Sequence, residues 1–268
     1  MILLFSIAVG GEGNAQNGYG VCRSRLNGEE LFIKDYVKDS YVVFDVGANI
    51  GSWTAIVKKY ARKAEIFAFE PYPKVFRILQ RASRRYENIQ LFNFALSRED
   101  GEGILFTWDT ANSLRQSGLN GLYYRPLLKK RKHRDPKEVL VKKTTLDLFC
   151  SEYNISHIDL LKIDTEGSEW DVLLGAHQMI INNHISAIQF EYGGCYTDSE
   201  TTLKEIYVFL TDNDYKIFRL SSIGLIPEEK WKDELENYKY SNWVALKQVD
   251  ESEKDARYKN LTYNFQDN

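Results

Sequence analysis

The feature that most constrains the fold is an alternation, from Tyr41 onward, of short apolar runs with amphipathic stretches. This alternation predicts strands connected by helices, the pattern of a parallel sheet with helices packed on its faces. We expect strands at 41–45, 65–69, 89–95, 158–163, 185–190, 215–220 and 243–246, and helices at 52–61, from Pro73 onward, and at 144–153, 169–181 and 200–211. The sequence therefore predicts an α/β fold with a mostly parallel, seven-stranded sheet that carries helices on both faces.

One stretch breaks the alternation. Residues 108–138 show little periodicity, and a segment of this length without elements of its own is usually a lid or an insertion in a compact domain. The basic run 129–134 within it favours a solvated loop, with binding of a phosphorylated or nucleotide-linked acceptor as the alternative. Just before the insertion, Gly101-Glu102-Gly103 is typical of a hairpin turn.

The two ends of the chain lie outside this pattern. Residues 1–27 begin with an apolar run, Met1 to Val9, which we interpret as a leader or an N-terminal packing segment. A short signal peptide is the alternative, although the basic region that normally precedes its apolar run is missing. Residues 250–268 form a polar tail, so we expect a single domain over 28–249 with the insertion near 108–138.

Charge and cysteine usage exclude several classes. The net charge is −3, so no global field draws the chain to nucleic acid or to an anionic membrane. The three cysteines, Cys22, Cys150 and Cys195, lie far apart without a CxxC pair, which argues against a disulfide framework or a zinc site. No stretch resembles a membrane span. We therefore expect a cytoplasmic protein, whose oligomeric state the sequence leaves open.

The turn after the first predicted strand, Asp45-Val46-Gly47-Ala48-Asn49-Ile50-Gly51, is the strongest candidate for a ligand site. In an open parallel sheet, ligands bind beyond the carboxyl ends of the strands, where this turn meets a helix. Gly47 and Gly51 can adopt unusual backbone angles and let a ligand approach the main chain. Glu70, at the end of the second strand, is placed to accept hydrogen bonds from the hydroxyls of a ribose.

The spacing of these glycines distinguishes between nucleoside cofactors. Dinucleotide enzymes use Gly-x-Gly-x-x-Gly, so that backbone amides reach a pyrophosphate. Here the spacing is Gly47-x-x-x-Gly51, and Asp45 precedes it, where its carboxylate could take the amine of a methionine moiety. This arrangement suits a positively charged cofactor without a pyrophosphate, which describes S-adenosyl-L-methionine, and it disfavours NAD.

Several segments resemble the FkbM-type methyltransferases. They are Val43 to Gly51, Phe69-Glu70-Pro71, Asn93 to Ser97, and the distinctive run Ile158 to Glu169 with Val172 to Ala176 after it. The resemblance implies a Rossmann-like class I methyltransferase fold and transfer of a methyl group to a hydroxyl of a sugar, a glycan or a secondary metabolite. It also implies a set of cofactor-binding residues: Asp45, Gly47, Ala48, Asn49, Gly51, Glu70, Pro71, Asn93, Ala95 and Leu96.

Four ionisable residues are expected at the rim of the same crevice. Asp164 follows the central fourth strand and is our candidate for the catalytic base or the acceptor anchor; Glu166 and Glu191 would orient the acceptor or the cofactor amine. Lys162 lies on the same strand face as Asp164. The alternatives are that Lys162 only neutralises Asp164 and that Glu166 to Glu169 only cap a helix. The carboxylates could also hold a divalent cation, but their spacing matches no known metal signature, so we expect none.

Two rival functions stay open. A nucleic-acid methyltransferase is disfavoured because an Asp-Pro-Pro-Tyr type run and a Pro-Cys nucleophile are missing, and the charge lacks a basic excess. A non-catalytic, cofactor-binding interaction subunit is disfavoured by the intact Asp45, Glu70 and Asp164. The partner we expect is a small-molecule or glycan acceptor, and no nucleic acid.

Overall fold

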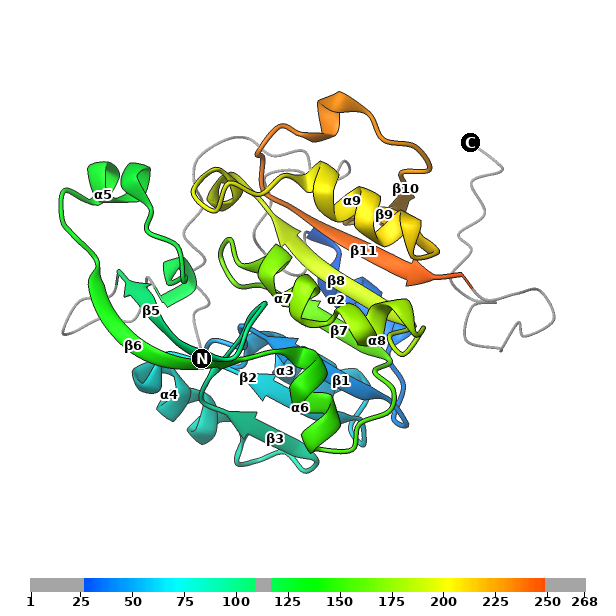
Figure 1. The fold of residues 1–268 in the computed structure, drawn as a ribbon. Helices are drawn as coiled ribbons and strands as arrows, with labels where there is room; N and C mark the ends of the chain where they lie inside the picture. The colour runs from blue at the N-terminus through cyan, green and yellow to red at the C-terminus, as the bar shows by residue number, and fades with distance from the viewer. Residues whose placement is uncertain (1–26, 109–116, 249–268) are drawn as a thin grey trace.

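The computed structural model describes residues 27–108 and 117–248, so the predicted polar tail and nearly all of the predicted leader lie outside the described residues. Its main sheet has the strand order β10-β9-β11-β8-β7-β1-β2-β3 (Figure 1). The strands are β1 (Val42–Val46), β2 (Glu65–Phe69), β3 (Ile89–Phe92), β7 (Leu160–Ile163), β8 (Ala187–Tyr192), β9 (Tyr215–Ser221), β10 (Gly224–Pro227) and β11 (Ser241–Lys247).

Five neighbouring strands of this sheet are parallel and three are antiparallel. β3, β2, β1, β7 and β8 pair in parallel, whereas β11, β9 and β10 pair with antiparallel neighbours. Counted in chain order, the parallel strands follow the Rossmann order 3-2-1-4-5, whose direction reverses between β1 and β7. The expected Rossmann-like α/β fold with a mostly parallel sheet is therefore confirmed.

The strand count is eight rather than the expected seven. The additional strand is β10, which forms a hairpin with β9 and lies at the edge of the sheet. The four residues Gly224–Pro227 begin with glycine and end with proline, which are turn residues rather than strand residues. These residues form a strand because a short connection brings them beside β9. Their own sequence therefore does not predict a strand.

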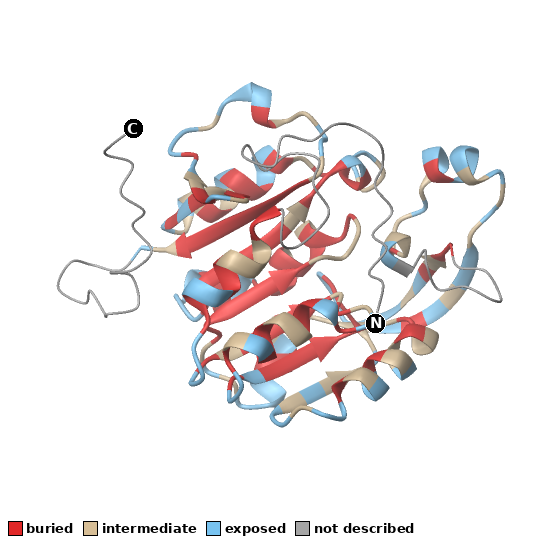
Figure 2. Cartoon of the chain, turned by 180° about the vertical axis from the view of Figure 1, so that it is seen from behind, coloured by how far each residue is buried: buried red, intermediate tan, exposed pale blue. Residues whose placement is uncertain are grey.

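Helices cover both faces of the sheet, as expected. One face carries α2 (Glu29–Tyr36), α3 (Ser52–Tyr60) and α4 (Pro73–Ser83), and the other carries α6 (Leu146–Glu152), α7 (Glu169–Gly175), α8 (His177–Ile181) and α9 (Leu203–Asp212). Because successive side chains of a strand point to opposite faces, Val43 joins one hydrophobic core and Phe44 the other. The central strands β1, β2, β7, β8 and β11 are consequently buried along nearly their whole length, whereas the edge strand β3 is not (Figure 2).

The helix predicted over 169–181 is two helices. α7 ends at Gly175, whose α-carbon faces the carbonyl of Ser97 so closely that a β-carbon would lie 2.0 Å from that oxygen. α8 then begins as a separate helix, because the Asp147 carboxylate accepts hydrogen bonds from the backbone N–H groups of Gln178 and Met179. The capping residue comes from another helix, so the pattern of 169–181 alone did not show the break.

A second, three-stranded sheet projects beside the main one, with the order β4-β6-β5 (Figure 1). It consists of β4 (Ala95–Leu96), β5 (Gly101–Thr107) and β6 (Lys137–Thr144), and α5 (Pro126–Lys132) lies between β5 and β6 in the chain. The predicted hairpin turn at 101–103 is wrong, because these residues belong to β5 and pair with residues 141–143 of β6. The predicted strand 89–95 is likewise too long, because β3 ends at Phe92 and Ala95 belongs to β4.

The small sheet packs on the main domain through one face only. Leu105 and Val141 point inward and pack against Tyr72 and Val75 at the start of α4. The remaining elements are short 3-10 turns at Ser117–Leu119, Gly194–Thr197 and Asp233–Leu235. Among the described helices, none combines the length and the apolar character needed to cross a membrane.

Candidate active site

The turn after β1 is compact and is held against the end of β2. Gly47, Asn49 and Gly51 have φ angles of 79°, 50° and 84°, so three of five consecutive residues are in the left-handed region. The backbone N–H groups of Gly47 and Ala48 both donate to the carbonyl of Phe69, at 3.0 and 2.9 Å. This geometry explains why glycine or asparagine is needed at these three positions.

The reason for Gly47 differs in part from the one that the sequence suggested. A β-carbon at Gly47 would lie 1.9 Å from the backbone oxygen of Asp164, so the loop after β7 occupies the space beside its α-carbon. Gly51 is constrained more weakly, with a β-carbon 2.8 Å from the Leu79 side chain. Gly47 therefore brings the two loops that carry the candidate cofactor and acceptor residues into direct contact.

Glu70 lies where the sequence placed it, directly after β2, and is 8% exposed. Its two carboxylate oxygens accept hydrogen bonds from the backbone N–H groups of Asn49, at 3.0 Å, and Tyr72, at 2.8 Å. Burial raises the pKa of Glu70 to about 7. The carboxylate therefore couples the first turn to the segment after β2.

The residues expected near the adenine are dispersed between a loop and the second sheet. The Asn93 side-chain amide donates to the carbonyls of Glu70 and Pro71, at 2.9 and 3.0 Å, and so holds the chain after β2. Ala95 and Leu96 form β4 and are 7% and 1% exposed. Leu96 also belongs to the main hydrophobic core.

Lys162 forms the centre of a buried charge cluster. Its ammonium lies 3.4 Å from Asp45 Oδ1 and 3.2 Å from Asp164 Oδ2, and its side chain is 5% exposed. The second oxygen of Asp45 accepts a hydrogen bond of 2.5 Å from the Thr54 hydroxyl. Burial alone would lower the pKa of Lys162, but Asp164, Asp45 and Glu29 outweigh it and raise that pKa. Lys162 therefore stays charged, and the predicted Lys162–Asp164 pair is present with Asp45 as an additional partner.

The three candidate carboxylates at the rim converge. Asp164, Glu166 and Glu191 each offer an oxygen, and these oxygens all lie within 4.8 Å of one another. Burial raises the pKa of Glu191, and the nearby Asp164 and Glu166 raise it further. Burial also raises the pKa of Glu166, although Arg125 opposes this shift. Within the described parts of the chain, the Glu191 carboxylate has no cationic partner, whereas Asp164 pairs with Lys162 and Glu166 with Arg125.

The helix capping by Glu166 to Glu169 that the sequence offered as an alternative is not present at α7, whose N-cap residue Ser168 makes no side-chain capping hydrogen bond; Glu169 instead binds the loop before the helix. Its carboxylate accepts hydrogen bonds from the backbone N–H groups of Thr165, at 2.7 Å, and Gly167, at 3.0 Å. Glu166 instead has a φ angle of 58° and pairs with a cation from another segment. Glu169 thus fixes the loop on which Asp164 and Glu166 are carried.

Sequence reasoning missed Arg125, which comes from the predicted insertion. Its guanidinium lies 2.9 Å from Glu166 Oε2 and 3.4 Å from Asp198 Oδ2, and its side chain is 14% exposed. The residues before it follow the crevice, because a β-carbon at Gly118 would lie 3.7 Å from the Asn49 side chain and one at Gly121 3.0 Å from the Glu166 carbonyl. No periodic pattern marks 117–125, so the sequence held no local signal for this contact.

Sequence reasoning also missed a contribution from α2. Glu29 accepts hydrogen bonds of 2.8 Å from the side-chain amides of Asn27 and Gln189. Asp45, Lys162 and Gln189 are direct neighbours across β1, β7 and β8, and so form one polar row beneath α2 and α3. Burial raises the pKa of Glu29, and Lys162 opposes this shift.

Acidic groups outnumber basic ones in this region. The carboxylates are Glu29, Asp45, Glu70, Asp164, Glu166, Glu169 and Glu191, and their cationic neighbours are Lys162 and Arg125. Two buried polar atoms next to the cluster, Gln189 Oε1 and Trp53 Nε1, have no hydrogen-bond partner in the described residues. Such groups are costly unless a ligand or water satisfies them. The crevice therefore suits a polar ligand that carries positive charge.

A Rossmann-ordered sheet, a glycine turn after β1 and an acidic crevice at the strand ends are the features expected of a class I, S-adenosylmethionine-dependent methyltransferase. The family model described as the methyltransferase FkbM domain matches residues 45–217. The chain belongs to the FkbM methyltransferase family, whose cofactor is S-adenosyl-L-methionine. The family expected from the sequence motifs is thus confirmed.

Three curated relatives are similar to this chain. Methyltransferase 1 of Beauveria bassiana is 30% identical over 168 residues, which cover 56% of this chain and 65% of that protein. The 2-O-methyltransferase NoeI of Sinorhizobium fredii is 28% identical over 152 residues, covering 53% and 60%. The hexuronic acid methyltransferase AglP of Haloferax volcanii is 25% identical over 171 residues, covering 62% and 61%. The chain thus spans less than two thirds of the length of each relative.

Proposed function

We propose that the protein transfers a methyl group from S-adenosyl-L-methionine to a hydroxyl of a sugar, a glycan or a secondary metabolite. The observation that carries this proposal is the convergence of Asp164, Glu166 and Glu191 within 4.8 Å beside the glycine turn. The names of NoeI, a 2-O-methyltransferase, and AglP, a hexuronic acid methyltransferase, favour an oxygen acceptor on a sugar.

The proposed cofactor site combines the first turn with the end of β2. Gly47, Ala48, Asn49 and Gly51 would contact the methionine part, with Glu70 at the ribose and Pro71, Asn93, Ala95 and Leu96 toward the adenine. When bound, the cofactor supplies a methyl group on a positively charged sulfur. The excess of carboxylates over Lys162 and Arg125 supports this assignment, because negative charge in a partly buried site stabilises a cation.

The proposed chemistry divides the work between two carboxylates. Asp164, whose carboxylate Lys162 holds at 3.2 Å, anchors the acceptor hydroxyl. Glu191, which has no cationic partner among the described residues, takes the hydroxyl proton as the oxygen–methyl bond forms and the methyl–sulfur bond breaks. Glu166 orients the acceptor. Alignment of the acceptor oxygen with the methyl group can supply several kcal/mol of the rate enhancement.

A methyl-transfer assay tests this proposal. The protein is incubated with methyl-labelled S-adenosylmethionine and with separated fractions of sugars, glycans, small metabolites, RNA and protein. We expect label in a carbohydrate or metabolite fraction, and a turnover at least about a hundredfold lower for Glu191→Gln. Glu152→Gln, on the surface of α6, is the matched control and should keep full activity. Label in RNA or protein, or turnover unaffected by Glu191→Gln, would contradict the proposal.

A further inference from the structure

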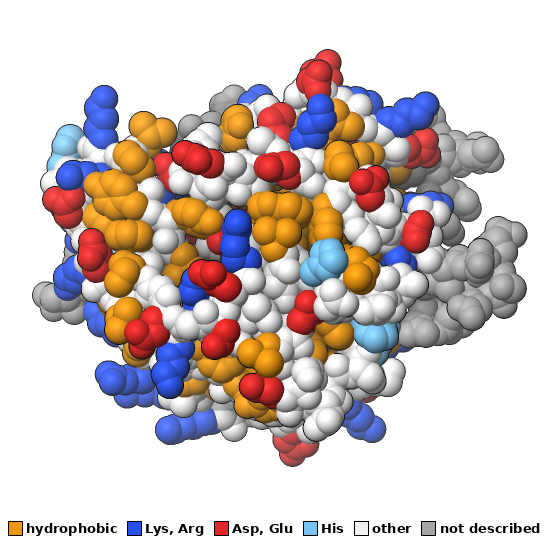
Figure 3. All heavy atoms as spheres, in the orientation of Figure 1, with side chains coloured by type: hydrophobic (Ala, Val, Ile, Leu, Met, Phe, Trp, Pro, Cys, Tyr) orange, Lys and Arg blue, Asp and Glu red, His pale blue; other side chains and the backbone are white. Residues whose placement is uncertain are grey.

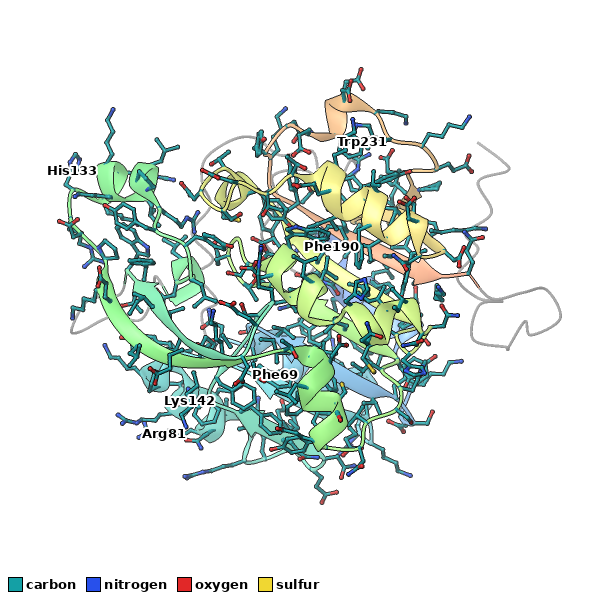
Figure 4. The ribbon with its side chains drawn as sticks, viewed as in Figure 1. Phe69, Arg81, His133, Lys142, Phe190 and Trp231 are labelled. Carbon is teal, nitrogen blue, oxygen red and sulfur yellow. The ribbon has the colours of Figure 1, made fainter. Side chains whose placement is uncertain are left out.

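Positive charge is concentrated on one projection of the molecule. Residues 126–144, which we call the basic arm, comprise α5, β6 and the loop between them. They contain eight lysines and arginines but only two acidic residues, whereas the whole chain has a net charge of −3. Figure 4 shows His133 at the outer end of this arm, well away from Phe190 in the central sheet. The remainder of the chain is correspondingly acidic, so the global charge conceals a local basic surface.

Apolar side chains are exposed on the same projection. Leu127 of α5 is 70% exposed and Leu140 of β6 is 60% exposed. Ile104 pairs directly with Leu140 across the β5–β6 ladder and is 39% exposed. The opposite face of this ladder packs on α4; on the outer face Phe106 contacts the Tyr124 ring, whereas Ile104 and Leu140 stay exposed. In Figure 3, hydrophobic side chains gather at the left of the molecule, with lysine, arginine and some acidic side chains around them.

The cations of α5 are only partly neutralised. Lys129 pairs with Asp135 at 2.7 Å, whereas Lys130, Arg131 and Lys132 form no ion pair with any residue that the structure describes. Burial, Arg131 and Arg134 lower the pKa of Lys132, because like charges are crowded at this end of the helix. An anionic partner would relieve this repulsion.

We propose that the basic arm docks on an anionic lipid surface, with Leu127 and Leu140 inserted at the level of the headgroups. A surface that combines exposed leucines with lysine and arginine gains from both apolar burial and attraction to anionic lipid. A nucleic acid would use the cations but would leave the leucines in water. A second copy of the chain is disfavoured because two arms with six excess positive charges each repel.

The basic arm is connected directly to the rim of the crevice, so docking of the arm would affect the crevice. Arg125, which immediately precedes α5, contacts Glu166 at the rim of the active site. The carboxyl ends of the parallel strands also point toward the side on which the arm projects (Figure 1). A docked arm would therefore place the crevice beside acceptors held at a membrane surface. Docking of the arm would locate the protein at a membrane whichever acceptor it methylates.

Vesicle co-sedimentation of the full chain tests the proposal. We expect binding to phosphatidylcholine vesicles that contain phosphatidylglycerol, weakened by added salt, and no binding to phosphatidylcholine alone. The triple variant Lys130→Glu, Arg131→Glu, Lys132→Glu should lower the partition coefficient at least about a hundredfold. The double variant Leu127→Ser, Leu140→Ser should lower it about tenfold or more at unchanged charge.

The matched controls lie on other surfaces. Ile223→Ser removes a side chain that is 59% exposed, and the triple variant Lys216→Glu, Lys230→Glu, Lys239→Glu removes exposed cations. Both should bind vesicles within about twofold of the parent, and all variants should keep the parent's melting temperature and its affinity for S-adenosylhomocysteine. No binding of the parent to anionic vesicles, or equal losses in the controls, would overturn the proposal. Two other results would also overturn it. One is a parent protein that self-associates through the arm and loses this self-association in the leucine variant; the other is an RNA oligonucleotide that displaces the parent from vesicles while the leucine variant binds vesicles as the parent does.

Discussion

Lys162 is the residue on which the electrostatics of the crevice depend most. Its ammonium is the only cation within 4 Å of Asp45 in the described chain, and Asp45 is completely buried. A buried ion pair contributes little net stability, but removing one partner leaves an uncompensated buried charge. Lys162 therefore does more than neutralise Asp164. Its charge also compensates the buried Asp45 carboxylate beneath the glycine turn.

A substitution at Lys162 tests this dependence. Lys162→Met keeps the length of the side chain but removes its charge, and it should lower the free energy of unfolding by about 3 to 5 kcal/mol. The measurement is urea denaturation followed by circular dichroism. Lys216→Met, on the exposed edge of β9, is the control and should change the value by less than about 0.5 kcal/mol. Similar values for the two variants would show that Lys162 has no such role.

Glu169 gives the stability a pH dependence of predictable sign. Burial raises the pKa of Glu169 from 4.5 to about 7, and the side chain is 1% exposed. A group whose pKa is raised in the folded state stabilises it fully below the unfolded pKa, and this contribution is lost as pH rises through the folded pKa. We therefore expect the contribution of Glu169 to fall by up to about 3 kcal/mol between pH 4.5 and 7.

Comparison with Glu169→Gln isolates this contribution. Residue 169 of the variant cannot ionise. The free energy of unfolding of the parent should therefore fall relative to that of the variant as the pH rises from 4.5 to 7. Glu152→Gln, on the exposed face of α6, controls for the loss of one carboxylate. A difference that is constant from pH 4.5 to 7 would contradict the assignment.

At the scale of elements, Arg125 ties residues 117–125 to the crevice, together with the Tyr123 hydroxyl, which donates to Asp171 of α7. Arg125 bridges Glu166 of the loop after β7 and Asp198 of the loop after β8. Both contacts join segments far apart in the sequence, and each is mostly shielded from water. Loss of this bridge should therefore loosen residues 117–125 beside the proposed acceptor site.

Limited trypsin digestion tests the bridge. The basic run 129–134 follows Arg125 closely and offers several cleavage sites. Arg125→Ala should speed cleavage there about tenfold or more, since local opening governs access of the protease. Lys232→Ala, which removes an ion pair with Glu228 on the other side of the domain, should leave that rate unchanged. An unaltered rate in Arg125→Ala would show that the bridge does not hold the segment.

The elements that sequence could predict are those with strong local patterns. Nearly continuous apolar patterns mark the strands β1, β2 and β7 and the buried faces of the helices α3 and α4. The bounds predicted for these elements agree with the structure within one or two residues. The Lys162–Asp164 pair followed from strand periodicity. By contrast, β10 depends on its pairing with β9, and Arg125 depends on contacts with Glu166 and Asp198 across more than 40 residues of chain. Such contacts arise from tertiary packing and leave no periodic trace.

On the scale of the whole molecule, charge is divided between two neighbouring regions. The crevice at the strand ends is acidic, and the arm that projects beside it is basic, although the chain as a whole has a net charge of only −3. The acidic region suits a cationic cofactor, and the basic arm suits an anionic surface. Both lie at the same side of the main sheet, where the parallel strands end (Figure 1).

The central claim is that the acidic crevice beside the glycine turn binds S-adenosylmethionine. Isothermal titration calorimetry of the folded chain with S-adenosylmethionine and S-adenosylhomocysteine tests it most directly. We expect saturable binding of both, at one site per chain, that is weakened at least about tenfold in Glu70→Ala, since the two backbone donors that Glu70 holds would lose their acceptor. A folded parent protein that binds neither compound would contradict the account.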